Sequence, residues 1–157
     1  MTEWIRYALP AAAIAASASP AYAMQYLSIE EAQKQAFPSA THFSEIQPGR
    51  VWKAEAGGRA VGFFIFDRVV GKHLYIDYAV ALTPAGAVHN VEVLQYRESY
   101  GGEIRNASWL AQFVGKTNAS ALKINGDIRN IAGATLSSTH VTEGVKRILA
   151  TYGSRLK

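Results

Sequence analysis

The pattern of apolar and polar residues predicts an amphipathic helix near the C-terminal end of the chain. Apolar side chains recur there every three or four residues, at Val141, Val145, Ile148, Leu149 and Tyr152. This spacing places them on one face of a helix that covers residues 137–152. Gly153 follows directly and is expected to end the helix.

Three stretches in the middle of the chain predict β-strands. Residues 61–70 and 74–83 are apolar and aromatic runs, and residues 88–96 alternate imperfectly between apolar and polar side chains. A Pro-Ala-Gly turn at residues 84–86 separates the second stretch from the third. Strands joined by such short turns predict an antiparallel meander.

Shorter signals complete the order of elements. The Ser-Ile-Glu-Glu sequence at residues 28–31 is a capping box, and it predicts a short helix that ends at Pro38. Residues 106–114 have helical apolar spacing, while residues 41–46 and 121–124 are candidate short strands. The order of helix, strands, helix, strand and helix predicts an α+β fold, with an antiparallel sheet and flanking helices in a single domain.

The composition supports one folded domain and narrows its chemistry. The chain has 157 residues, of which 49% are hydrophobic and 18% are charged, and it contains no cysteine. Disulfides, cysteine–zinc sites, thiolate-bound iron–sulfur clusters and cysteine-linked haem are therefore excluded. Any redox chemistry must use a cofactor that other atoms hold.

The first 23 residues have the layout of a secretory signal peptide. Residues 7–18 are mostly apolar and rich in alanine, and an Ala-Tyr-Ala cleavage site ends at Ala23. The apolar run is shorter than the ~20 residues that cross a bilayer. We expect cleavage after Ala23, with residues 24–157 as the mature domain in the periplasm or another extracytoplasmic compartment. The alternatives are an uncleaved membrane anchor and a buried N-terminal helix.

Several classes of function find no support in the sequence. The formal net charge is +4, but the densest basic region lies in the C-terminal helix, where the helix dipole favours cations. We therefore expect no nucleic-acid partner. The sequence has no P-loop, dinucleotide-binding glycine motif, nucleophile elbow or zinc-protease motif. Its four histidines are scattered, so we predict structural or surface roles for them, and we predict neither a catalytic nor a metal-binding residue.

Residues 130–138 are the stretch most suited to binding a ligand. Their sequence, Asn-Ile-Ala-Gly-Ala-Thr-Leu-Ser-Ser, leads directly into the C-terminal helix. Gly133 lets the backbone approach a ligand closely, and a helix start offers unpaired N–H groups that bind phosphate. Thr135, Ser137 and Ser138 add hydroxyl groups at the same place. The alternative is that these residues form an ordinary N-cap.

This stretch also resembles a known family. Ala-Gly-Ala-Thr-Leu-Ser-Ser at residues 132–138, followed by Val-Thr-Glu-Gly-Val at 141–145, is similar to the FMN-binding domain family. That family includes the flavin-carrying C subunit of the sodium-translocating NADH:quinone oxidoreductase and the G subunit of the Rnf complex. In its Ser-Gly-Ala-Thr motif, the threonine bears FMN through a phosphoester that a flavin transferase installs from FAD with magnesium. The resemblance implies that Thr135 carries FMN, with Gly133, Ala134, Leu136 and Ser137 around it.

Two segments upstream extend the resemblance. Residues 98–104 are similar to a family segment that follows a strand and lies against the flavin, which implies contacts from Glu98, Tyr100 and Gly101. Residues 109–116 are similar to the next family block. Lys116 is a candidate partner for the phosphate or for the negative charge of a reduced flavin. Three aromatic residues are candidates to wall the flavin ring or, alternatively, to pack in the core: Tyr96, Tyr100 and Trp109.

Three hypotheses follow for the function. The first is an exported electron carrier whose FMN on Thr135 relays electrons between redox partners, one of them membrane-bound or soluble. The second is an exported module that holds FMN or another phosphate ligand without a covalent bond. It draws support from Ala132, where the family usually has serine, and from Arg129, where the family usually has aspartate. The third is a redox enzyme that reduces a small acceptor, although no acid–base residue near the motif favours it.

Overall fold

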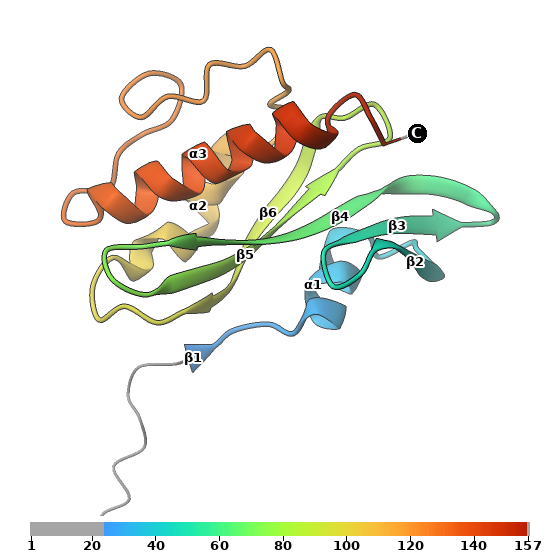
Figure 1. Ribbon diagram of the computed structural model, residues 1–157, viewed down its shortest axis with the longest axis horizontal. Coiled ribbons are helices and arrows are strands. Elements are labelled where there is room, and N and C mark those ends of the chain that lie inside the picture. The colour runs from blue at the N-terminus through green and yellow to red at the C-terminus, as the bar shows by residue number, and fades with distance from the viewer. Residues whose placement is uncertain (1–23, 157) are drawn as a thin grey trace, which may run out of the picture.

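The structure is a computed structural model that describes residues 24–156, and its centre is one antiparallel sheet (Figure 1). The strands follow the order β1-β6-β5-β4-β3-β2 across the sheet, which is a meander for all but the first strand. Their bounds are Met24–Gln25 (β1), His42–Gln47 (β2), Val51–Ala56 (β3), Arg59–Val70 (β4), Tyr75–Leu82 (β5) and Val88–Tyr96 (β6). The predicted α+β fold with an antiparallel sheet is therefore confirmed.

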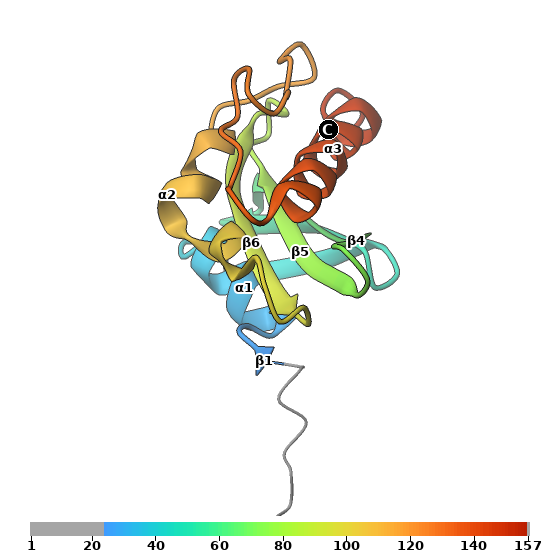
Figure 2. The ribbon, with the colours of Figure 1, turned by 90° about the vertical axis from the view of Figure 1, so that its left-hand side faces the viewer.

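The helices lie on both faces of the sheet (Figures 1 and 2). Helix α1 covers Ile29–Ala36, α2 covers Ala107–Leu110 and α3 covers Thr135–Tyr152, and single 3-10 turns cover Gly102–Arg105 and Ala111–Phe113. Figure 2 shows α3 on one side of the sheet and α1 on the other. Within residues 24–156, no helix is long and apolar enough to cross a membrane.

Apolar side chains on the two faces of the sheet form two separate core clusters. On β5, Tyr78 and Val80 belong to the cluster that includes the apolar stripe of α3, whereas Ala79 and Ala81 belong to the cluster beneath α1. Successive side chains of a strand point to opposite faces, so both faces of this strand are buried. Each large aliphatic side chain buried in this way contributes about 1.5–3 kcal/mol. The short alanine side chains leave room for α1 to lie close to the sheet.

The structure confirms the three central strands but adds two that the pattern did not predict, β1 and β3. Strand β3 has buried side chains at Val51 and Ala54, three positions apart rather than two. The register against β4 shifts between Ala54 and Glu55, which indicates a β-bulge. The extra residue at this bulge is Val61 of β4, because Ala54 pairs with Gly62 and Glu55 with Ala60. Strand β3 itself escapes recognition because its two buried positions do not follow the two-residue alternation of a half-buried strand.

Two predicted elements outside the sheet take a different form in the structure. The expected helix at 106–114 breaks after Leu110 into a 3-10 turn, which still buries Phe113 because this residue lies three positions beyond Leu110. The expected strand at 121–124 is only an isolated bridge from Ile124 to Ile128. The carboxylate of Asp127 accepts hydrogen bonds from backbone amides in this segment, which therefore do not pair with a strand.

The close contact between α3 and the sheet depends on Gly144. A Cβ atom there would overlap the Tyr78 hydroxyl and lie 3.0 Å from Val69 Cγ1. We expect Gly144→Ala to lower the free energy of unfolding by about 1–3 kcal/mol, because overpacking outweighs the gain in helix propensity. Denaturant unfolding measures the change, with Lys146→Ala at an exposed position of α3 as the control. An unchanged or increased stability would contradict this role.

Candidate cofactor-binding site

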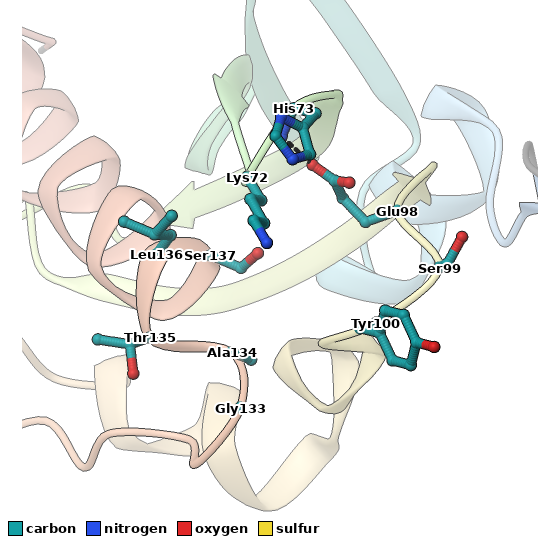
Figure 3. A pocket seen from close by; sticks show the side chains of 10 residues that line it. All are labelled: Lys72, His73, Glu98, Ser99, Tyr100, Gly133, Ala134, Thr135, Leu136 and Ser137. Carbon is teal, nitrogen blue, oxygen red and sulfur yellow. Dashed lines mark hydrogen bonds between the residues drawn. The ribbon is translucent and has the colours of Figure 1, made fainter.

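Three segments that are distant in the sequence converge on one cavity (Figure 3). They are the turn at residues 71–74 between β4 and β5, the segment at 98–101 that follows β6, and the start of α3. The cavity has a volume of about 540 Å³, within the ~300–1,000 Å³ usual for ligand pockets. Its lining consists of Lys72, His73, Glu98, Ser99, Tyr100, Gly133, Ala134, Thr135, Leu136 and Ser137.

The start of α3 presents an uncapped helix end to this cavity. Thr135 is the first helical residue, and Ala134 occupies the N-cap position without a side-chain hydrogen bond. The interpretation of these hydroxyl residues as an ordinary N-cap is therefore wrong. Helix α1, by contrast, has a complete capping box from Ser28 and Glu31. The first turn of α3 also contains no acidic residue, so its N–H groups keep the positive end of the helix dipole for an anion.

The hydroxyl group of Thr135 is exposed and held in place by its neighbours. Asn130 Nδ2 donates a hydrogen bond to Thr135 Oγ1 at 3.2 Å, and Ser138 Oγ donates to Asn130 Oδ1 at 3.0 Å. With Asn130 Oδ1 against the Ser138 hydroxyl, the NH₂ group of the same amide faces Thr135. The sequence alone does not single out Asn130, because this contact arises only after the chain turns back at Gly133, where φ is +81°.

Gly101 allows the segment after β6 to lie against the start of α3. Its φ is +85°, and a Cβ atom there would be 2.7 Å from the Tyr96 hydroxyl and 3.0 Å from Ala134 Cβ. Glycine adopts this conformation without strain and leaves the space that the contact needs. Gly101 itself lies at the edge of the cavity rather than in its lining, and it brings Tyr100 and Ala134 together there.

Glu98 anchors the turn at residues 71–74. Its Oε1 accepts hydrogen bonds from the backbone N–H groups of His73 at 2.5 Å and Leu74 at 2.7 Å. Desolvation raises the pKa of this carboxyl, but the hydrogen bonds from the backbone of the turn outweigh it and leave the pKa below its ordinary value. On the other side of the turn, His140 Nδ1 lies 2.6 Å from the Val70 carbonyl oxygen, a distance at which it donates a hydrogen bond.

Only one of the three aromatic residues proposed as flavin walls is free to act as one. Tyr100 is 86% exposed, and its ring stands beside the cavity (Figure 3). Tyr96 is buried and donates its hydroxyl hydrogen to the Tyr100 carbonyl. Trp109 is also buried, and its indole N–H donates to the Arg129 carbonyl at 2.7 Å. Trp109 therefore has the core-packing role, in which it also positions the chain that leads to Thr135.

The structure does not bring Lys116 to the cavity. Its Nζ lies 3.1 Å from Asp127 Oδ2, and the pKa of Asp127 falls to about 2, chiefly through the hydrogen bond from the Lys123 amide and in part through Lys116. The cation in the cavity is Lys72, which sequence reasoning missed because its turn belongs to none of the recognised motifs. Lys116, which the sequence predicted to face the ligand, therefore lies outside the lining of this cavity.

Among residues 24–156, no group of three or more acidic or histidine side chains could hold a metal ion. What converges on the cavity is a free helix start with hydroxyl groups, an exposed aromatic ring and an apolar side chain from Leu136. These features define a site for a phosphorylated ligand that carries a flat ring system.

Comparison with known proteins identifies the ligand. The model of the FMN-binding domain family matches residues 71–150, a span that contains every residue lining the cavity. This chain therefore belongs to the FMN-binding domain family, and FMN is its cofactor. The structure is similar to that of NqrC from Shewanella oneidensis, with a TM-score of 0.52 and 15% identity over 80% of this chain and 75% of that one. No curated protein matches the chain.

The anchoring role of Glu98 can be tested through pH. We expect Glu98→Gln to lower the free energy of unfolding at pH 7 by about 1 kcal/mol or less, because the partly exposed carboxylate loses its charge-assisted hydrogen bonds. The folded-state pKa is lowered, so the contribution is present above the unfolded-state pKa of ~4.3 and is lost as pH falls through the folded value.

The measurement is denaturant unfolding of both proteins at pH 7 and near pH 3. The two proteins should differ at pH 7 and converge at the acidic pH. Glu103→Gln is the matched control, because the Glu103 carboxylate accepts no hydrogen bond from the described part of the chain. A difference that stays constant with pH would contradict the anchoring role.

Proposed function

We propose that this protein is an exported flavoprotein that carries electrons, with FMN joined through its phosphate to Thr135 Oγ1. The observation that carries the proposal is the exposed Thr135 hydroxyl at the uncapped start of α3, beside the cavity. The family model spans this position, and the resemblance of residues 132–138 to the family motif supports attachment at the same threonine.

The residues around Thr135 are suited to the two ends of FMN. The phosphate is expected at the start of α3, where N–H groups and the helix dipole favour an anion. Apart from its two chain neighbours, no residue has a heavy atom within 4 Å of the position that a Cβ on Gly133 would take, so the loop is open there. Tyr100 and Leu136 offer apolar surface to the ring system. When bound, FMN supplies the reversible uptake and release of electrons, while the protein supplies position and electrostatics.

The attachment is a transfer of a phosphoryl group without any change in oxidation state. Thr135 Oγ1 forms a new bond to the FMN phosphorus of FAD, the anhydride P–O bond breaks, AMP leaves and the hydroxyl proton is released. A flavin transferase with magnesium is the expected catalyst. The hydrogen bond from Asn130 supports this role, because it holds the oxygen in one orientation and leaves it exposed to an external enzyme.

The second candidate function is non-covalent binding of FMN, and Arg129 favours it. The Arg129 backbone is held by Gln112 Oε1 at 2.8 Å and by Trp109, while the residue itself is exposed. An exposed cation therefore occupies the position where the family usually has an aspartate for recognition by the transferase. Asp127, two residues earlier, is bound to backbone amides and to Lys116.

Intact mass distinguishes the two candidates. The full chain is produced with a flavin transferase in the same compartment, and the protein is denatured before its mass is measured. We expect a mass increase equal to FMN minus one water, because the ester survives denaturation. Thr135→Ala should abolish the increase, whereas Thr151→Ala, at an exposed threonine far along α3, should retain it. Unmodified wild-type protein that releases yellow flavin would support non-covalent binding, and colourless protein would contradict both candidates.

Export rests on residues 1–23, which lie outside the described part of the chain. On this proposal, cleavage after Ala23 places the mature domain in the periplasm or another extracytoplasmic compartment. There it exchanges electrons with a membrane-bound or soluble redox partner. A covalent bond would keep the cofactor with the protein in a compartment where it is not resynthesised.

Fractionation of the cells tests export. We expect the protein in the extracytoplasmic fraction to begin at Met24, as determined from its N-terminal peptide. Ala23→Phe should leave uncleaved precursor, because the signal peptidase requires a small residue at this position. Cytoplasmic protein would contradict export, and membrane-bound protein that retains residues 1–23 would indicate an anchor instead.

A further inference from the structure

We propose that Lys72 stabilises the negative charge that FMN acquires on reduction, and that this residue thereby raises the reduction potential of the flavin. This inference rests on the proposed placement of FMN in the cavity beside α3. The reaction takes two electrons from a reduced redox partner and one proton from water, which leaves one negative charge on the ring system. A cation close to that charge favours the reduced form, and the effect is larger at the edge of a protein cavity than in bulk water.

The lining of the cavity contains a single lysine or arginine. Lys72 belongs to the β4–β5 turn, and its side chain extends across the cavity toward Ser137 at the start of α3 (Figure 3). Its ammonium group forms no ion pair and no side-chain hydrogen bond with residues 24–156. Nearby arginines are neutralised in other places: Arg68 and Arg97 both bind Asp77. Lys72 is therefore the cation available to a ligand in this cavity.

The turn that carries Lys72 is fixed at both ends. Glu98 accepts hydrogen bonds from the backbone N–H groups of His73 and Leu74. On the other side, the ring of His140 in α3 contacts the carbonyl oxygen of Val70. The Glu98 carboxylate is directed toward these amides, whereas the Lys72 ammonium is directed toward α3 (Figure 3). The acidic group therefore serves to hold the turn, and it does not form an ion pair with the lysine.

The geometry assigns Lys72 to the ring rather than to the phosphate. The Thr135 hydroxyl, the proposed attachment atom, points away from Lys72 in Figure 3 and accepts a hydrogen bond from Asn130. The phosphate is thus expected on the Asn130 side of the helix start. Lys72 approaches from the opposite side, across the space that remains for the ring system.

The test compares the reduction potential of the flavin in the wild type, Lys72→Gln, Lys72→Arg and Lys116→Gln. All four proteins are produced with the flavin transferase, and their FMN content is determined by mass and absorbance. The potentials are then measured by equilibration with a reference dye during reduction by dithionite. Lys116→Gln is the matched control, because this ammonium is paired with Asp127 outside the cavity.

We expect Lys72→Gln to shift the equilibrium toward oxidised flavin by about tenfold, equivalent to a potential ~30 mV lower for a two-electron couple. Lys72→Arg should keep the wild-type potential because it keeps the charge, and Lys116→Gln should also leave it unchanged. Full FMN content with an unchanged potential in Lys72→Gln would overturn the inference and leave the proposed function intact. Loss of FMN from Lys72→Gln with an unchanged potential in the remaining holoprotein would also overturn it, since it would indicate a phosphate contact. Absence of FMN from the wild type would instead overturn the proposed function.

Discussion

The site depends on the depth at which α3 packs into the sheet. Gly144 lets the helix backbone reach Tyr78, and the Tyr78 hydroxyl donates to Asp67 at 2.7 Å. Burial and the charge of Asp67 raise the pKa of Tyr78, which keeps its hydroxyl a donor at every ordinary pH. Arg147, one helical turn along α3 from Gly144, binds the same carboxylate, so the network fixes both the distance and the rotation of the helix. Because this contact lies in the middle of α3, it also determines where the first residue of the helix stands.

The antiparallel topology of the sheet places the other two segments of the site beside the start of α3. The β4–β5 turn and the end of β6 meet at one end of the sheet, and α3 begins at that same end (Figure 1). The bonds from Glu98 to the turn, and the contact between Gly101 and Ala134, join these segments directly. The cavity is thus built on rigid elements, although most of its residues lie in loops. This arrangement combines precise placement of a ligand with backbone groups that remain accessible to it.

The sequence predicts those parts of this structure that depend on local patterns. The amphipathic stripe of α3, the three central strands and the loop around Gly133 can all be recognised within short windows. Contacts between distant segments cannot be recognised in this way. Lys72 lines the cavity because Glu98 accepts hydrogen bonds from the backbone of its turn. Lys116 instead forms an ion pair with Asp127, whose carboxylate also accepts a hydrogen bond from the backbone of Leu122. For that reason the motif locates Thr135 at the helix start, where the structure also has it, but it does not indicate that Lys72 lines the cavity and Lys116 does not.

Exposure at this site is a requirement of the proposed chemistry rather than a defect in packing. A cofactor held only by contacts gains affinity from enclosure, whereas an external transferase must reach the hydroxyl that it modifies. Thr135 is exposed, Tyr100 is 86% exposed and Leu136 is 48% exposed, so the proposed attachment residue and the surfaces proposed for the ring all face solvent. A covalent bond removes the need for burial, and an open ring can approach a redox partner closely. The same openness weakens non-covalent retention, which is why attachment to Thr135 and electron transfer between proteins belong to one proposal.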